Sequence, residues 1–253
     1  MSERNVVLSL AAHPDDAEFF CAGTLALLAE RGWSVHIATM TAGDCGTVQY
    51  SREEIARIRR NEAAAAAALI GATYHCLECD DAFVMYDRPT LLKVIALIRR
   101  VQPAIVLAPC REDYMTDHVH TSRLAMTGCF CAGVVNIDTG DARPFEPTPH
   151  LYYTDPLEGK DIYGRDVPPS LVVDVADVFE TKRRMLACHA SQRDWLLTHH
   201  GIDEYIQMME RLSQACGQRA GVAYGEGFRQ HLGSAFPQDD RLSAALGPAA
   251  HRL

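Results

Sequence analysis

The chain has 253 residues, of which 48% are hydrophobic and 23% charged, a composition typical of a globular protein with a sizeable core. A formal net charge of -9 argues against nucleic acid or an anionic membrane as the main partner. No apolar run approaches the ~18 residues of a membrane-spanning helix, and the N-terminus has no signal-peptide pattern. Nine cysteines without a dense framework fit a reducing compartment. We therefore expect a cytoplasmic protein without membrane insertion.

Strands and helices alternate through the first half of the chain. Short apolar runs predict buried strands over residues 5–11, 34–40, 73–77 and 104–108. Helices are predicted over residues 17–31, 51–69, 89–101 and 118–131. The second of these helices opens with a capping box formed by Ser51 and Glu54. This alternation predicts an α/β fold in which helices cover both faces of a mostly parallel sheet.

The pattern is weaker after residue 133. Residues 138–149 predict a long loop, 151–154 and 171–175 two more strands, and 179–197 and 202–216 two more helices. The stretch after Pro237 is rich in Ala, Asp and Arg, and we expect it to be poorly ordered. With no internal repeat or clear linker, we expect one domain over residues 1–253. Its core would span about 5–200, followed by C-terminal helices and a tail over 201–253.

Two polar loops follow strands that should be neighbours. In doubly wound sheets the first and fourth strands lie side by side, and ligands bind beyond their carboxyl ends. The loop after the first strand is Ala12-His13-Pro14-Asp15-Asp16. The loop after the fourth strand carries four more polar side chains, Asp113, Asp117, His118 and His120. We expect both loops to face one crevice.

These residues are suitable ligands for a catalytic metal ion. A catalytic zinc takes three protein ligands and leaves a position for water, whose pKa then falls to about 7. His13 and Asp16 supply two ligands, and His118 is the best placed third. Asp15 lies between the first two and could accept the proton of the water as general base. Each residue also has a structural interpretation, since Asp16 could cap a helix and His118 could begin one.

At this point the motifs resemble those of the LmbE-like (PIG-L) zinc-dependent de-N-acetylases. The resemblance covers roughly residues 5–125, with a fainter similarity over residues 189–192. It rests on five segments, namely Ala12-His13-Pro14-Asp15-Asp16, Cys21-Ala22-Gly23-Thr24-Leu25, Thr41-Ala42-Gly43-Asp44, Ile58-Arg59 with Glu62-Ala63, and Asp113-Tyr114 with Asp117-His118.

The resemblance implies a Rossmann-like three-layer α/β/α fold and hydrolysis of an acetamide on an amino sugar. By motif position it implies His13, Asp16 and His118 as metal ligands and Asp15 as the base. The metal would be Zn²⁺, with Fe²⁺ or another divalent ion as alternatives. Bacterial members are often oligomeric, so a homo-oligomer is expected. Asp117 is expected to lie behind the ligands as a hydrogen-bonding partner.

The chain departs from the family pattern at Met115. Many members have a histidine there, which helps to stabilise the transition state or to protonate the leaving amine. A thioether cannot donate a proton. Three explanations compete, in this order: Asp15 returns the proton itself, His120 or His189 takes over with His189 preferred, or the site has drifted towards binding.

Three further residues are candidate substrate contacts. Arg59 could bind substrate hydroxyls or a phosphate, or pair with Glu62 on its own helix. Tyr114 could form a wall of the sugar pocket or be a buried aromatic residue. Asp44 lies in the Gly43–Gly46 loop, which is either a turn or a place where a ligand meets the backbone.

The sequence thus predicts a zinc-dependent hydrolase that removes an N-acyl group, most simply acetyl, from a small sugar-containing substrate. The main alternative is a metal- or sugar-binding protein with little or no activity, because of Met115. A nucleotide-binding protein ranks lower, because the Gly43–Gly46 loop follows the second strand and lacks a P-loop lysine.

Overall fold

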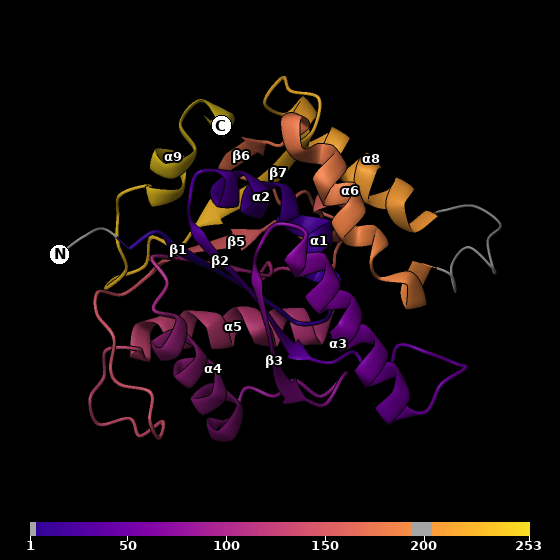
Figure 1. The fold of residues 1–253 in the computed structure, drawn as a ribbon. Coiled ribbons are helices and arrows are strands. Elements are labelled where there is room, and N and C mark those ends of the chain that lie inside the picture. The colour runs from indigo at the N-terminus through magenta and orange to yellow at the C-terminus, as the bar shows by residue number, and fades with distance from the viewer. Residues whose placement is uncertain (1–3, 194–203) are drawn as a thin grey trace.

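The computed structural model describes residues 4–193 and 204–253. One eight-stranded sheet runs through it in the order β3-β2-β1-β4-β5-β7-β6-β8 (Figure 1). Its strands are β1 (Val6–Ala11), β2 (Ser34–Thr41), β3 (Thr73–Cys79), β4 (Ile105–Ala108), β5 (His150–Thr154), β6 (Leu171–Asp174), β7 (Gly225–Gln230) and β8 (Ala250–Arg252). The α-helices are α1 (Asp16–Phe20), α2 (Ala22–Glu30), α3 (Arg52–Ala68), α4 (Arg88–Val101), α5 (Thr116–Cys131), α6 (Phe179–Ala187), α8 (Glu204–Gln218) and α9 (Arg241–Leu246).

The N-terminal half of the sheet is parallel, as the alternation of strands and helices predicts. β1 pairs in parallel with β2 on one side and with β4 on the other, while β3 and β5 extend the parallel set outwards. The predicted neighbourhood of the first and fourth strands is therefore confirmed. β7 pairs antiparallel with both β5 and β6, and β8 pairs antiparallel with β6, so the second half of the sheet is mixed.

Helices cover both faces of the sheet, and successive residues of β1 show how. Val7 belongs to a core packed beneath α2, α6, α8 and α9, whereas Leu8 belongs to a second core beneath α4 and α5 (Figure 1). Both side chains are fully buried. Because consecutive side chains of a strand point to opposite faces, an apolar strand such as β1 fills two cores at once. The three-layer α/β/α prediction is confirmed.

Three predicted elements differ in the structure, and one strand was not predicted. The single helix expected over 17–31 is two helices, because the backbone leaves helical geometry at Cys21, with φ -147° and ψ 8°. The helix expected over 179–197 ends at Ala187 in the structure. Residues 194–197 of the expected helix lie outside the described ones. β7 was not predicted at all. The tail expected to be poorly ordered instead forms α9 and β8, and Leu242 and Leu246 of α9 are buried in the core.

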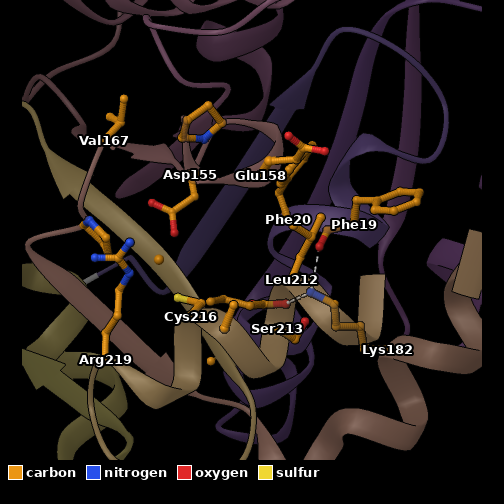
Figure 2. Close-up of a pocket in the computed structure, with 17 residues that line it drawn as sticks. Phe19, Phe20, Asp155, Glu158, Val167, Lys182, Leu212, Ser213, Cys216 and Arg219 are labelled. Carbon is orange, nitrogen blue, oxygen red and sulfur yellow. Dashed lines mark hydrogen bonds and ion pairs between the residues drawn. The ribbon is translucent and has the colours of Figure 1, made fainter. Parts of the chain in front are cut away.

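A buried ion pair fixes the break between α1 and α2. Lys182 of α6 is fully buried, and its Nζ donates to Glu226 Oε1 at 2.6 Å and to the carbonyl of Phe19 at 2.8 Å (Figure 2). Glu226 in turn accepts from the first amides of α2, those of Gly23 at 2.9 Å and Thr24 at 2.7 Å. Each charge is paired and hydrogen-bonded, as a buried ion pair requires. Side chains from the C-terminal third thus hold both helix ends beside the polar loop.

Candidate active site

Three potential metal ligands converge where β1 and β4 end. His13 follows β1, Asp16 begins α1, and His118 lies in the first turn of α5. One ligand atom from each of the three lies within 4.8 Å of the others. Asp16 Oδ1 is 3.3 Å from His118 Nε2, and Asp16 Oδ2 is 3.6 Å from His13 Nδ1. The two loops meet because parallel neighbours present their carboxyl ends at the same edge of the sheet.

The backbone orients the Asp16 carboxylate. Its Oδ2 accepts hydrogen bonds from the amides of Ala12 at 3.0 Å and His13 at 2.8 Å. The other oxygen, Oδ1, is thereby directed towards His118. Burial alone would raise the pKa of Asp16, but the two histidines beside it hold that pKa well below its usual range. Asp16 is therefore an ionised, preoriented carboxylate that could bind a cation.

His118 lies between two carboxylates. Its Nδ1 is 3.0 Å from Asp113 Oδ1 and its Nε2 faces Asp16, yet neither contact has hydrogen-bond geometry. Burial opposes a charge on the ring, but Asp16 and Asp113 outweigh it and raise the pKa of His118 to about 10. This corner of the site therefore stabilises positive charge. Buried ring nitrogens without hydrogen bonds, facing carboxylates, are the donor set that a divalent cation such as zinc requires.

His13 has acidic neighbours on its other side. Its Nε2 lies 3.1 Å from Asp81 Oδ1 and 3.3 Å from Asp117 Oδ2. Burial disfavours the charged ring, but hydrogen bonds with these carboxylates and with Asp16 raise the pKa of His13 well above its usual value. Asp117 also accepts from the amides of Ala82 at 2.9 Å and Val84 at 3.2 Å, so it joins the loop after β3 to the histidine. This position behind a candidate ligand is the one expected of Asp117.

Asp15 lies beside the three potential ligands in a left-handed conformation, with φ 101°. This backbone is costly for a residue with a side chain, by about 1–3 kcal/mol. The carboxylate accepts from Tyr205 Oη at 2.5 Å and from Arg59 Nη2 at 3.3 Å, both on Oδ2. Burial raises the pKa of Asp15, and Arg59 counteracts that rise. The arrangement provides a held carboxylate next to the three potential ligands, which is the position that a general base would need.

Arg59 points inward from α3. Its Nη2 donates to the carbonyl of Pro14 at 2.6 Å as well as to Asp15, and its Nη1 donates to the carbonyl of Gly43 at 3.3 Å. A Cβ on Gly43 would lie 2.2 Å from the guanidinium, and one on Gly46 2.6 Å, which accounts for the glycines of this loop. The structure thus places the predicted substrate contact against the polar loop itself, with 4% of its surface exposed.

His189, the predicted replacement for the missing acid, is wholly buried. Its Nε2 lies 3.5 Å from Glu18 Oε2, and neither ring nitrogen has a hydrogen-bond partner among the residues that the structure describes. His120, the other candidate, has its Nδ1 2.5 Å from the carbonyl of Val84. His189 is therefore buried beside Glu18 of α1, and His120 lies against the loop that contains Val84.

Tyr114 and Asp44 lie at different depths. The Tyr114 ring is 62% exposed and meets His118 edge-on, with ring centroids 6.1 Å apart, so it can contact a substrate. Asp44 accepts from the Asp81 amide at 2.9 Å and pairs closely with Arg52. Asp44 therefore stabilises the loop after β3 through its hydrogen bond with the Asp81 amide.

The sequence analysis placed Asp113 in the crevice but did not select two other residues that contact the site, Asp81 and Tyr205. Asp81 stands in the loop after a predicted strand, where the position of an acidic residue is the signal that could have indicated it. Tyr205 begins α8 and reaches Asp15 across 190 positions. Nothing in the local sequence around Tyr205 indicates that contact.

Residues 8–129 match the family model described as PIG-L, GlcNAc-PI de-N-acetylase. The chain carries a PIG-L (LmbE-like) domain. All four residues proposed for the metal and the base, His13, Asp15, Asp16 and His118, lie within the matched segment. Members of this family include de-N-acetylases, which hydrolyse amide bonds.

Proteins similar to this chain have two kinds of activity. The chain is 28% identical to the diacetylchitobiose deacetylase of Thermococcus kodakarensis, over 88% of this chain and 82% of the relative. It is 26% identical to the 4-oxalmesaconate hydratase of Pseudomonas putida, over 94% of each chain. Among solved structures, the N,N'-diacetylchitobiose deacetylase of Pyrococcus horikoshii superposes with a TM-score of 0.77 at 26% identity, covering 90% of this chain and 84% of that one.

Proposed function

We propose that this protein is a zinc-dependent hydrolase that removes an N-acyl group, in the first instance acetyl, from a small substrate containing an amino sugar. The observation that carries the proposal is the juxtaposition of His13, Asp16 and His118, with the Asp15 carboxylate held beside them. Similarity to deacetylases of acetylated sugars supports the same substrate class.

The cation would be held by His13, Asp16 and His118. Bound there, zinc would supply a Lewis acid for the amide carbonyl and lower the pKa of water to about 7. The chain's own share begins with Asp15, which accepts a proton as the water oxygen attacks the carbonyl carbon. Breakage of the carbon–nitrogen bond then requires a proton on nitrogen, and Asp15 can return the one it took. The products are a carboxylic acid and an amine.

The placement of the alternatives supports this use of Asp15. His189 and His120 are engaged with Glu18 and the Val84 carbonyl, and Met115 has no proton to give. A single carboxylate serving first as base and then as acid needs no further group. In this proposal Asp15 takes over the role of the histidine that many family members have at position 115.

A second candidate is hydration of a carbon–carbon double bond in an unsaturated acid. Similarity to a hydratase extends over 94% of both chains, further than the similarity to any of the deacetylases reported above. Addition of water expels no amine, so a proton donor for a leaving amine, which Met115 cannot provide, is not needed. Asp15 would take a proton from water and deliver it to carbon, while the oxygen of the water joins the neighbouring carbon.

One set of assays separates the two functions. The zinc-loaded protein is tested for acetate release from diacetylchitobiose and other N-acetylglucosamine conjugates, and for consumption of 4-oxalmesaconate. We expect acetate release, reduced about 10²- to 10⁴-fold by Asp15→Asn at unchanged zinc content. Conversion of the unsaturated acid without acetate release would establish the second candidate. Zinc binding without turnover of any of these substrates would favour a binding protein.

A further inference from the structure

Among the residues that the structure describes, the hydrogen bonds to the Asp15 carboxylate reach one of its two oxygens. Its Oδ2 accepts from Tyr205 Oη at 2.5 Å and from Arg59 Nη2 at 3.3 Å. None of the residues within 4–193 and 204–253 donates a hydrogen bond to its Oδ1. The side chain is 15% exposed, so it is not sealed off. The two oxygens therefore differ: two donors anchor Oδ2, whereas Oδ1 accepts from none of the described residues.

Tyr205 can act only as an anchor in this position. The residue is 7% exposed, and its ring packs edge-on against Phe19, with centroids 5.0 Å apart and planes at 79°. Asp15 Oδ2 is the acceptor of its hydroxyl. Arg59, by contrast, divides its donors between Asp15 and two backbone carbonyls, and its bond to Asp15 is the longer one. Tyr205 is thus the donor dedicated to Asp15.

We propose that Tyr205 is a positioning residue that fixes Asp15 Oδ2, so that Oδ1 is the oxygen that accepts and returns the proton. The inference rests on the function proposed above and adds a residue from outside the segment matched by the family model. A carboxylate free to rotate would present either oxygen in many orientations. Orientation of a catalytic group within about 10–20° is what a rigid supporting shell provides.

The test compares Tyr205→Phe with a matched control, Tyr224→Phe. Tyr224 Oη also donates to a carboxylate, Glu210 Oε1 at 3.2 Å, but away from the site. We expect Tyr205→Phe to lower kcat about 10- to 100-fold, as loss of one hydrogen bond to a charged group implies, with KM within twofold and zinc content unchanged. Tyr224→Phe should leave all three unchanged. Equal kcat values for Tyr205→Phe and the wild type would overturn the proposal.

A double-mutant cycle with Asp15→Asn shows whether Tyr205 acts through Asp15. Once Asp15 is replaced, Tyr205→Phe should change the residual rate less than twofold. A full additional loss in that background would mean that Tyr205 acts elsewhere, and would refute the inference.

The same four proteins are also unfolded in urea, a measurement that needs no substrate. Coupling between positions 15 and 205 should appear in the unfolding midpoints, and its absence would show that Tyr205 does not hold Asp15. If the wild type turned over none of the substrates, the proposed function would fail, while the unfolding cycle would still decide whether Tyr205 fixes this carboxylate. The two failures are therefore distinguishable.

Discussion

His118 joins the two halves of the candidate site, because it alone of the three proposed ligands comes from the β4 side of the crevice. Its neighbours Asp113 and Asp16 surround it with negative charge. A cation held by three side chains would lose one of them if this imidazole were removed. The effect of that removal can be compared with removal of His120, which is one half-turn further along α5 and contacts Val84 instead.

We expect His118→Ala to lower zinc affinity more than about 100-fold, since loss of a partner outside the ligand shell alone costs 10–100-fold. His120→Ala should keep close to one zinc per chain. Metal analysis after dialysis against a weak chelator measures both. Stoichiometric zinc in His118→Ala would remove this residue from the ligand set.

The sequence predicts the positions of some site residues better than those of others. His13, Asp16 and His118 could be predicted to converge because strand order in doubly wound sheets is regular, and the structure brings them within 4.8 Å. Tyr205 could not be predicted, because its contact depends on how α8 packs against α1. Arg59 was correctly predicted to lie on a helix. Whether its side chain points towards substrate or towards Asp15 depends on the Gly43–Gly46 loop, which packs against its guanidinium.

Among the elements, β2 and β3 are joined by a pair of histidines as well as by their backbones. His36 Nδ1 and His75 Nε2 lie 3.0 Å apart and their rings stack, with planes at 18°. Burial lowers the pKa of both side chains, and for His75 the neighbouring His36 lowers it further. Only one proton can lie between the two nitrogens, and protonation of both rings would place two like charges in contact.

This pair should make stability fall as the medium becomes acidic. Because both folded-state pKa values are lowered, the unfolded chain binds more protons below the ordinary histidine pKa of about 6.5. The stabilisation is complete above that pH and is lost as the pH falls below it. Urea unfolding at pH 7.5 and 5.5 should show a larger drop for the wild type than for His75→Gln. Equal drops would show that the pair does not titrate in this way.

For the whole molecule, the C-terminal residues complete the sheet. Tyr152 of β5 donates its hydroxyl to Asp240 at 2.8 Å and accepts from the amide of Leu242 at 3.0 Å. Leu242 and Leu246 are 0% and 1% exposed. Composition suggested disorder here because the stretch is short and rich in small and charged residues, whereas its two leucines are enough to anchor it. β7 was not predicted because Gly225-Glu226-Gly227 has low strand propensity. This segment is a strand because it pairs with β5 and β6.

Removal of residues 238–253 should therefore destabilise the protein. Burial of the two leucines alone is worth about 3–6 kcal/mol, at roughly 1.5–3 kcal/mol each. The urea midpoint of the truncated chain, compared with that of Leu242→Ala, measures the effect, and we expect the truncation to cost more than the substitution. An unchanged midpoint would show that the tail contributes nothing to the free energy of unfolding.

The Lys182–Glu226 pair has a consequence for how such proteins can diverge or be recombined. The family model ends at residue 129, yet the polar loop inside it depends on Lys182, Glu226 and Tyr205, all of which lie beyond that boundary. A chimera that joined residues 1–129 to the C-terminal part of a relative would leave the carbonyl of Phe19 and the amides of α2 without partners, unless the relative supplied an equivalent lysine and glutamate. The part of the chain that must be kept together is therefore longer than the segment that the family model matches.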